Sequence, residues 1–544
     1  MNNSFLRALT VLRTIAAHGV KHAIISPGSR NAPFIYASAS VSEIEFHSRI
    51  DERTAAFTAL GIAKETNQPT AVITTSGTAV AHTYPAILEA EKSNIPLLII
   101  SADRPSFLKN SGASQTLDQN ELFGKHVNFA LDIHESYPVH ALTQEVTRAI
   151  SYSIGFKNNS GPVHINVAFA EPLLPRTNTE DSIKIPKLRK TKSHQVDWKA
   201  NKNSPNGTLV IAAEGSTEDA KDYAEQFRLP IIADITTPAQ ASENTVSYPE
   251  ELVKYFIPQI KQVIVFGKPT LFRTVLSLLA NSELEIIIVS TDMAWHNSGM
   301  QATKIADLAS LPTFATNDSK WLAKWQKASK IANATHNFSE LNQFAAAKII
   351  WKNKNCARLV VGASNIIRHL TTVSNTNLPA EKILSSRGLA GIDGTIATAT
   401  GVAIASKKPT RVYLGDITAL HDASSLYKAP LEADYDLHIV ILNDGGGTIF
   451  NTLEHGAQTQ YQNTVHRFFT TPQDANFKAL AAAYDWRYNQ ANTISELNEC
   501  IDDYKKGRVI TEVIIEAVDI RTLQNEISQQ VIEKLIKTIG KLDY

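Results

Sequence analysis

The 544-residue sequence has little of the residue types and patterns that mark several classes of protein. Its two cysteines, Cys356 and Cys500, show neither metal-ligand spacing nor a disulfide framework, which suits a reducing cytoplasm. It has no excess of one charge, with 53 Lys+Arg against 53 Asp+Glu, so nothing steers the whole chain to nucleic acid or anionic lipid. No stretch approaches the roughly 20 apolar residues that span a bilayer, and Arg7 and Arg13 break the N-terminal segment too often for a signal peptide. We therefore expect a cytoplasmic protein with no nucleic-acid partner and no membrane span.

Short β-rich runs alternate with helical patterns along most of the chain. Such alternation predicts an α/β fold with parallel sheets covered by helices on both faces. At this length a single core is excluded and roughly three domains are expected. The predicted strands are "HAIISPGS", "PTAVITTSG", "IPLLIISADRP", "GPVHINVAF", "GTLVIAAEG", "LPIIADI", "KQVIVFGKP", "LEIIIVST", "ARLVVGAS", "TRVYLGD", "DLHIVILND" and "RVITEVIIEA".

The strands divide into three doubly wound blocks, and the first and third resemble two copies of one α/β plan. We expect a first domain at 1–175, a linker at 176–206, a central domain at 207–345 and a third domain at 346–544. The linker is rich in Pro, Lys, Asn and Ser and has no periodicity. The central domain has no G-x-G-x-x-G pattern, so no dinucleotide fingerprint is expected there.

Polar side chains follow two consecutive predicted strands of the third domain. Asp416 comes directly after "TRVYLG", and Asn443 ends the apolar part of "DLHIVILND". Because ligands of open parallel sheets bind at the carboxyl ends of the strands, we expect both at one ligand-binding edge. The carbonyl of Gly445, in a glycine run, adds a third hard oxygen, and Mg²⁺ prefers such ligands. The alternative is that Asp416 only caps a helix and that "NDGGG" is a plain loop.

This Gly-Asp pair, with Asn443 after a helix-length gap, resembles the thiamine-diphosphate (ThDP) motif. The motif usually has Gly as its third residue, where this chain has Ile417. The resemblance implies ThDP and Mg²⁺, with Mn²⁺ as a substitute, held by Asp416, Asn443 and the Gly445 carbonyl. It also implies active sites between a pyrimidine domain and a diphosphate domain of different subunits, and therefore a homodimer or a dimer of dimers.

Glu52 lies where such enzymes need a glutamate, at the start of a helix after a strand, in "IEFHSRIDERTAAF". An acid at a helix N-terminus usually serves the helix dipole, and this interpretation is kept for Asp51. ThDP chemistry instead requires a carboxyl group that shares a proton with the ring nitrogen N1′ of the aminopyrimidine, which leads to loss of the proton at C2. We expect Glu52 to be that catalytic and cofactor-binding residue. Ile392 matches the bulky apolar residue that holds the cofactor in its bent form, with ordinary packing as the alternative.

Seven stretches in chain order resemble the 2-succinyl-5-enolpyruvyl-6-hydroxy-3-cyclohexene-1-carboxylate synthase family of menaquinone biosynthesis. They are "ISPGSRNAPF", "DERTAAFTALGIAK", "TTSGTAVAHTYPAILEA", "ISADRP", "GASQTLDQNELFG", "SRGLAGIDGTIATATG" and "NDGGGTIF". The resemblance implies ThDP-dependent decarboxylation of 2-oxoglutarate and 1,4-addition of the resulting carbanion to isochorismate. The nearest alternative is another ThDP-dependent 2-oxoacid decarboxylase or an acetohydroxyacid-synthase-type carboligase. A non-catalytic cofactor-binding protein is a further alternative.

Both implied substrates are dianions, so the site should be rich in arginine, which binds carboxylates bidentately. The residues that match the family's substrate-binding positions are Ser29, Arg30, Arg104, Gln115, Arg273, Ser364, Arg368, Arg387, Ile449, Phe450 and Leu453. Ser114 replaces a family asparagine, and Arg273 stands alone where the family has two basic residues. The histidines His47, His82 and His421 are not expected to bind metal, because none has a partner at ligand spacing.

Overall fold

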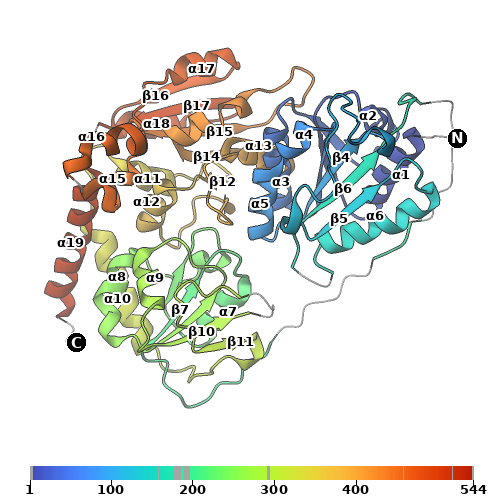
Figure 1. Cartoon of the computed structure of the whole chain (residues 1–544). Helices are drawn as coiled ribbons and strands as arrows, with labels where there is room; N and C mark the ends of the chain where they lie inside the picture. The colour runs from blue at the N-terminus through green and yellow to red at the C-terminus, as the bar shows by residue number, and fades with distance from the viewer. Residues whose placement is uncertain are drawn as a thin grey trace. The chain divides into compact units, whose positions relative to one another are not determined.

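The computed structural model of the chain describes residues 4–156, 159–175, 185–188, 196–290, 295–457, 459–516 and 519–541 (Figure 1). It contains three sheets, of six, five and six strands. The strand pairs with a described register are parallel, and the predicted α/β class is confirmed. No helix in these ranges combines the length and apolar character that a membrane crossing requires.

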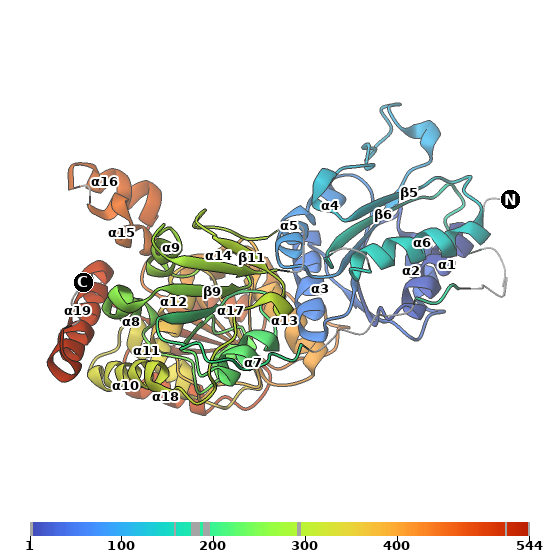
Figure 2. The ribbon, with the colours of Figure 1, turned by 90° about the horizontal axis from the view of Figure 1, so that it is seen from below.

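The first sheet has the strand order β2-β1-β3-β4-β6-β5. Its strands are β1 (His22–Ile25), β2 (Glu45–Ser48), β3 (Thr70–Thr74), β4 (Leu97–Asp103), β5 (Phe129–Ile133) and β6 (Pro162–Ala168). One apolar core joins it to α1 (Ser4–Ala17), α2 (Ala32–Ser38) and α6 (Val139–Ser153). A second joins its other face to α3 (Glu52–Thr66) and α5 (Tyr84–Lys92). Figures 1 and 2 both show α3 and α5 on the opposite side of this sheet from α1 and α6.

The second sheet has the order β11-β10-β9-β7-β8. Its strands are β7 (Thr208–Ala212), β8 (Ile231–Ala233), β9 (Gln262–Phe266), β10 (Glu285–Val289) and β11 (Lys304–Ala306). The core on one face includes residues of α7 (Glu218–Gln226). The core on the other includes residues of α8 (Pro249–Phe256), α9 (Arg273–Leu279) and α10 (Lys320–Thr335).

The third sheet has the order β13-β12-β14-β15-β17-β16. Its strands are β12 (Arg358–Val361), β13 (Lys382–Ser385), β14 (Thr410–Gly415), β15 (Leu437–Asn443), β16 (Arg487–Ala491) and β17 (Arg508–Ile514). Its helices include α11 (Gln343–Lys352), α12 (Asn365–Val373), α13 (Thr395–Ser406), α14 (Asp416–His421), α15 (Ile449–Thr452), α18 (Ile494–Asp502) and α19 (Ile520–Ile539). When each sheet's strands are counted from its own first strand, the first and third sheets have the same order, so the predicted common plan is confirmed.

The chain divides into two compact units. The first sheet forms one unit together with residues 386–410 and 418–437, and the second and third sheets form most of the other. The expected boundaries at 175, 206 and 345 remain predictions, and much of the expected linker, 176–184 and 189–195, lies outside the described residues.

Helices α3 and α13 pack closely within the first unit, and two glycines make this possible. A Cβ on Gly61 would lie 2.0 Å from the carbonyl oxygen of Thr398, and a Cβ on Gly401 would lie 2.0 Å from that of Thr58. Only glycine permits so close an approach of two backbones. This contact fixes the helix that begins with Glu52 against the helix that follows Ile392.

Candidate active site

The carboxyl edge of the third sheet holds the predicted metal ligands. Asp416 begins α14 directly after β14, and Asn443 is the last residue of β15, the neighbouring strand. Asp416 is 2% exposed. Burial raises the pKa of its carboxyl group, because charge is poorly solvated there. A buried carboxylate at a strand end is a strong ligand for a divalent cation.

The oxygens of Asp416 and Asn443 converge on a single amide group. The Nε2 of Gln473 donates to Asp416 Oδ2 at 2.7 Å and to Asn443 Oδ1 at 3.0 Å. Gly445 has a φ of 79°, and its amide donates to Asn443 Oδ1 at 3.1 Å. Two hard oxygens that already face one small donor, beside the exposed Gly445, fit a magnesium ion.

Glu512 fixes which end of the Asn443 amide faces Asp416. Asn443 Nδ2 donates to Glu512 Oε1 at 2.6 Å, and the hydroxyl of Tyr488 donates to Glu512 Oε2 at 2.5 Å. The Asn443 oxygen therefore faces Asp416 and Gln473. The sequence analysis missed both Gln473 and Glu512. A charged residue inside the apolar run "RVITEVII" is a signal that points to Glu512, whereas no local pattern marks Gln473.

Glu52 and Asp51 differ in their contacts although they are adjacent. Asp51 caps α3, since its side chain accepts hydrogen bonds from the amides of Arg53 and Thr54, and this prediction is confirmed. Glu52 is partly buried at the first helical position. Among the described residues its carboxylate has no hydrogen-bond or ion-pair partner. The Glu52 carboxylate is therefore available to an external ligand.

The segment before α13 carries Arg387 and Ile392 and is held at two points. Carboxylate oxygens of Glu89 accept hydrogen bonds from the amides of Gly388 at 2.9 Å and Leu389 at 2.7 Å. Arg387 is 2% exposed, and Ile392 is partly buried.

Asp422, which is fully buried, accepts hydrogen bonds from the amides of Ile396 and Ala397 at the start of α13. Glu89 and Asp422 are thus positioning residues that the sequence analysis did not identify.

The predicted substrate residues of the first sheet lie on the turns after β1 and β4. Arg104 follows β4 and donates to the carbonyl of Gln115 at 2.8 Å and to its side-chain oxygen at 3.3 Å. It also bonds the hydroxyl of Ser76. Arg30 donates to the carbonyl of Phe169 at 3.0 Å. Burial, and then the positive charge of Arg104, lowers the pKa of Arg30, while Glu171 and Asp103 act against this shift, so the two cations lie close enough to interact.

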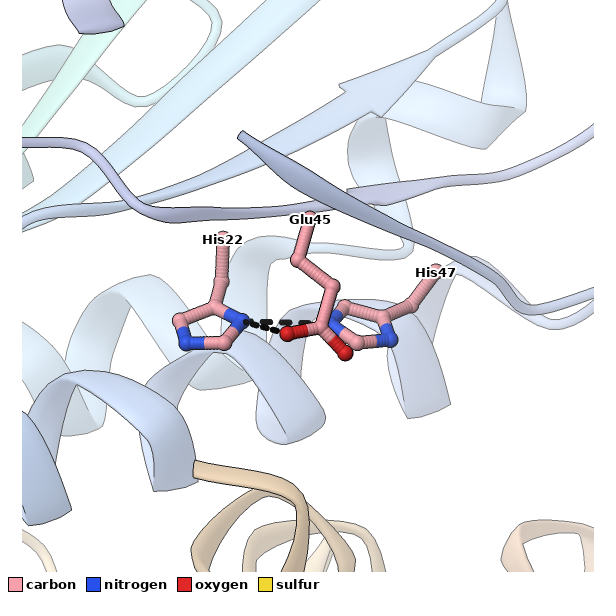
Figure 3. A group of neighbouring side chains, drawn as sticks. All are labelled: His22, Glu45 and His47. Atoms are coloured by element: carbon pink, nitrogen blue, oxygen red, sulfur yellow. Dashed lines mark hydrogen bonds and ion pairs between the residues drawn. The ribbon is translucent and has the colours of Figure 1, made fainter. Parts of the chain in front are cut away.

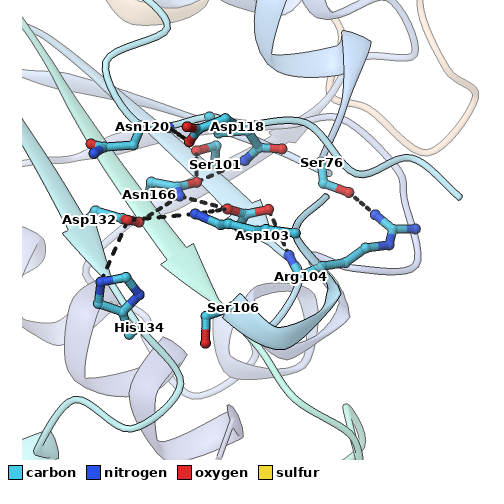
Figure 4. A network of polar contacts seen from close by, with 12 residues as sticks. Ser76, Ser101, Asp103, Arg104, Ser106, Asp118, Asn120, Asp132, His134 and Asn166 are labelled. Atoms are coloured by element: carbon cyan, nitrogen blue, oxygen red, sulfur yellow. Dashed lines mark hydrogen bonds and ion pairs between the residues drawn. The ribbon is translucent and has the colours of Figure 1, made fainter. Parts of the chain in front are cut away.

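A polar network under this region fixes Arg104, as Figure 4 shows. Asp103 is buried and accepts hydrogen bonds from the Arg104 amide at 2.8 Å and from Asn166 Nδ2 at 2.9 Å. Asn166 also donates to Asp132 at 2.8 Å. The buried Gln119 links this network to the loop after β3. Ser29 is exposed in the turn beside Arg30.

Four predicted residues from distant parts of the sequence line one cavity of about 210 Å³: Arg273, Arg368, Ile449 and Leu453. Arg368 also donates to the carbonyl of Ser364 at 2.6 Å. Phe450 is not among the lining residues and instead packs against Phe469, with the ring centroids 5.4 Å apart and the rings tilted by 59°.

The cavity also has acidic residues that the sequence analysis did not single out. One is Glu251, whose pKa is raised by burial to about 7.

Comparisons with known proteins agree with these site regions. The profile of "Thiamine pyrophosphate enzyme, N-terminal TPP binding domain" matches residues 8–122, and that of the "C-terminal TPP binding domain" matches 366–515. The chain is 37% identical to the 2-succinyl-5-enolpyruvyl-6-hydroxy-3-cyclohexene-1-carboxylate synthase of Renibacterium salmoninarum, over 96% of both chains. It is 38% identical to the synthase of the same name from Paenarthrobacter aurescens, over 94% of both. Its identity to that of Rhodococcus erythropolis is 32%, over 97% of this chain and 100% of the relative.

Proposed function

Because the chain belongs to the 2-succinyl-5-enolpyruvyl-6-hydroxy-3-cyclohexene-1-carboxylate synthase family, we propose that it joins 2-oxoglutarate to isochorismate with loss of CO₂. It is a ThDP-dependent transferase of menaquinone biosynthesis that forms a carbon–carbon bond. The bond from C1 to C2 of 2-oxoglutarate breaks, and the former keto carbon adds in a 1,4 sense to isochorismate. The observation that carries the proposal is the convergence of Asp416 and Asn443 on one donor at the sheet edge.

The metal-binding role falls to Asp416, Asn443 and the carbonyl of Gly445, which would hold Mg²⁺, or Mn²⁺ in its place. Their carboxylate, amide and carbonyl oxygens are the donor set that a hard divalent ion prefers. Bound ThDP would supply the electron sink that makes loss of CO₂ from 2-oxoglutarate feasible. Ile392, on the segment held by Glu89 and Asp422, would orient the cofactor.

The proton-transfer role falls to Glu52. Its carboxyl group would hold a proton at N1′ of the aminopyrimidine, and the lack of a described partner within the chain supports this role. Because the family resemblance implies that Glu52 meets a cofactor held by another subunit, we expect at least a homodimer with active sites at the interface. Two cysteines without a disulfide suit a reducing cytoplasm.

The substrate-binding role falls to the arginines and their neighbours. Arg30 and Arg104, with Ser29 and Gln115, form one cationic region in the first unit. In the second unit, Arg273 and Arg368 face a cavity with the apolar Ile449 and Leu453. Cationic groups beside an apolar wall suit dianions with a carbon skeleton. Arg387, Ser364 and Phe450 complete the proposed set.

The test combines purified protein, Mg²⁺, ThDP, 2-oxoglutarate and isochorismate, with the product identified by its mass. Asp416→Ala should abolish product formation and holoenzyme assembly, whereas Asp434→Asn, at a highly exposed carboxylate, should leave both unchanged. Turnover of pyruvate without turnover of 2-oxoglutarate would instead favour an acetohydroxyacid-synthase-type enzyme. Absence of CO₂ release from any 2-oxoacid would overturn the proposal.

A further inference from the structure

Three metal-ligand side chains meet on one face of the first sheet, at its outer edge (Figure 3). Strand β2 is the edge strand and pairs with β1 in parallel. In this register His22 lies beside Glu45, and Ile24 lies beside His47, so the three ligands share a face. This corrects the expectation that His47 has no partner at ligand spacing, because its partners come from across the strand pair.

The distances among the three side chains suit a transition metal. His22 Nδ1 lies 3.2 Å from His47 Nε2 and 3.8 Å from Glu45 Oε2. One ligand atom from each of the three residues lies within 4.8 Å of the other two. Two nitrogens on a tetrahedral zinc ion with usual bond lengths are separated by roughly 3.3–3.4 Å. The imidazole pair therefore has nearly the spacing that zinc requires without any rearrangement of the strands.

A further carboxylate lies beside the more buried imidazole. The Nδ1 of His47, the nitrogen that faces away from His22, lies 3.9 Å from Glu432 Oε2. Arg49 holds that carboxylate oxygen at 3.3 Å. Metal-bound histidines usually point their second nitrogen at a carboxylate, which fixes the tautomer and the ring. This arrangement leaves His47 Nε2 to face His22 and Glu45.

We propose that His22, Glu45 and His47 bind a zinc-like divalent cation, with water at the remaining position. Nitrogen ligands distinguish this site from the hard-oxygen site of Asp416 and Asn443, which suits magnesium. In the metal-free chain one imidazole donates a hydrogen bond to the other, and the ion takes the place of that proton. The ion ties edge strand β2 to β1.

Lys407 and Arg49 are positive charges that oppose this cation, and Lys407 is the one that contacts a proposed ligand. Its Nζ lies 3.7 Å from Glu45 Oε2, and its side chain is 74% exposed, so it can turn away into solvent. It competes with the ion for the same carboxylate oxygen. Removal of this positive charge, as in Lys407→Gln, should therefore tighten metal binding.

The experiment uses the full chain, stripped with a chelator and then saturated with Mg²⁺ and ThDP so that the hard-oxygen site is filled. Zn²⁺ is added, and equilibrium dialysis with metal analysis measures the bound ion. Co²⁺ absorption in the visible range reports nitrogen coordination. We expect one equivalent of Zn²⁺ per chain, and loss of that equivalent in His47→Ala and Glu45→Gln. Glu45 is 44% exposed, so Glu45→Gln should fold normally.

Two further variants sharpen the outcome. Glu432→Gln, which changes only the orienting carboxylate, should weaken binding by about 10- to 100-fold. The control is His126→Ala, because His126 also lies beside a carboxylate, Glu91 at 2.9 Å, but belongs to no group of three metal-ligand side chains among the described residues. It should bind Zn²⁺ as the parent chain does. Equal Zn²⁺ binding by the parent, His47→Ala and Glu45→Gln, or no retained Zn²⁺ in the parent, would overturn the proposal.

Discussion

The first and third sheets share one strand order but have side chains of different charge at corresponding strand ends. After the second strand, the first sheet has Glu52 where the third has Arg387. After the fourth strand, the first has Arg104 where the third ends in Asn443. We call the edge of the first sheet with Arg30 and Arg104 the cationic edge, and the edge of the third sheet with Asp416 and Asn443 the oxygen-rich edge. At the second strand the signs are reversed, since the acid Glu52 is on the first sheet and the cation Arg387 is on the third. The scaffold fixes where functional groups stand, and the residues that follow each strand decide which ligand they meet.

The largest effect is expected at Glu52, the proposed catalytic acid on the first sheet. Glu52→Gln keeps the size of the side chain and removes its titratable proton. Exchange of the C2 proton of bound ThDP for deuterium should slow by roughly 10²- to 10⁴-fold. Asp51→Asn is the matched control, since asparagine also caps helices, and it should exchange at the parent rate. Equal rates in Glu52→Gln and the parent would return Glu52 to a helix-dipole role.

The cationic edge is tested by Arg30→Ala. Loss of one charge-assisted contact to a carboxylate costs about 1.5–3 kcal/mol, or roughly 10- to 150-fold in turnover of the dianionic substrates. ThDP affinity should stay near the value of the parent protein, because Arg30 is not among the residues proposed to bind the metal or the pyrimidine ring. Steady-state kinetics with varied 2-oxoglutarate measure the first effect, and cofactor titration the second. Arg148→Ala, at an exposed arginine, is the control. A collapse of ThDP affinity with normal 2-oxoglutarate saturation would reassign Arg30.

The oxygen-rich edge is tested through Glu512, which touches Asn443 but not the metal position. Glu512→Gln allows the Asn443 amide to turn over, and Mg²⁺ affinity should fall by about 10- to 100-fold. Titration of Mg²⁺ at saturating ThDP measures this fall. Glu499→Gln, at a carboxylate on the surface of α18, should not change it. Unchanged Mg²⁺ affinity in Glu512→Gln would show that Asn443 needs no orienting partner.

The common plan of the first and third sheets is tested at the contact between α3 and α13. Each of these helices follows the second strand of its sheet. Gly61→Ala and Gly401→Ala each place a methyl group against the other helix's backbone. Each should lower the free energy of unfolding by about 1–3 kcal/mol, because the backbones must separate. Chemical denaturation measures this change, with Gly415→Ala as the control for loss of a glycine, because the nearest atom to its added Cβ, in Ile366, would lie 4.0 Å away. A large loss in only one of the pair would show that the contact is not reciprocal.

The sequence predicted every central strand and missed four of the six edge strands. Strands β5, β11, β13 and β16 were not predicted, and each lies at the edge of its sheet. The missed strands are short or include polar and half-buried residues, as "RYNQA" of β16 does, whereas the edge strand β8 is apolar and buried and was predicted. A search for apolar runs therefore finds the centre of a parallel sheet first.

The residues of the candidate site were likewise predictable only in part. Asp416 and Asn443 were predictable because each directly follows a buried strand, and strand ends of a parallel sheet meet at one edge. Gln473 and Glu512 were not, because they reach those ligands from segments with no fixed spacing to them. His22 and His47 were missed for a related reason, since only strand register brings them together.

Gln473 places a side-chain amide between the two proposed metal ligands, Asp416 and Asn443. Its amide keeps the oxygens of Asp416 and Asn443 apart and satisfied, so the buried carboxylate need not find another partner while no ion is bound. Metal binding then replaces the Gln473 amide with a cation between the two oxygens, and the strand ends keep their positions. The strand ends can therefore keep one geometry whether an amide or a cation lies between their oxygens.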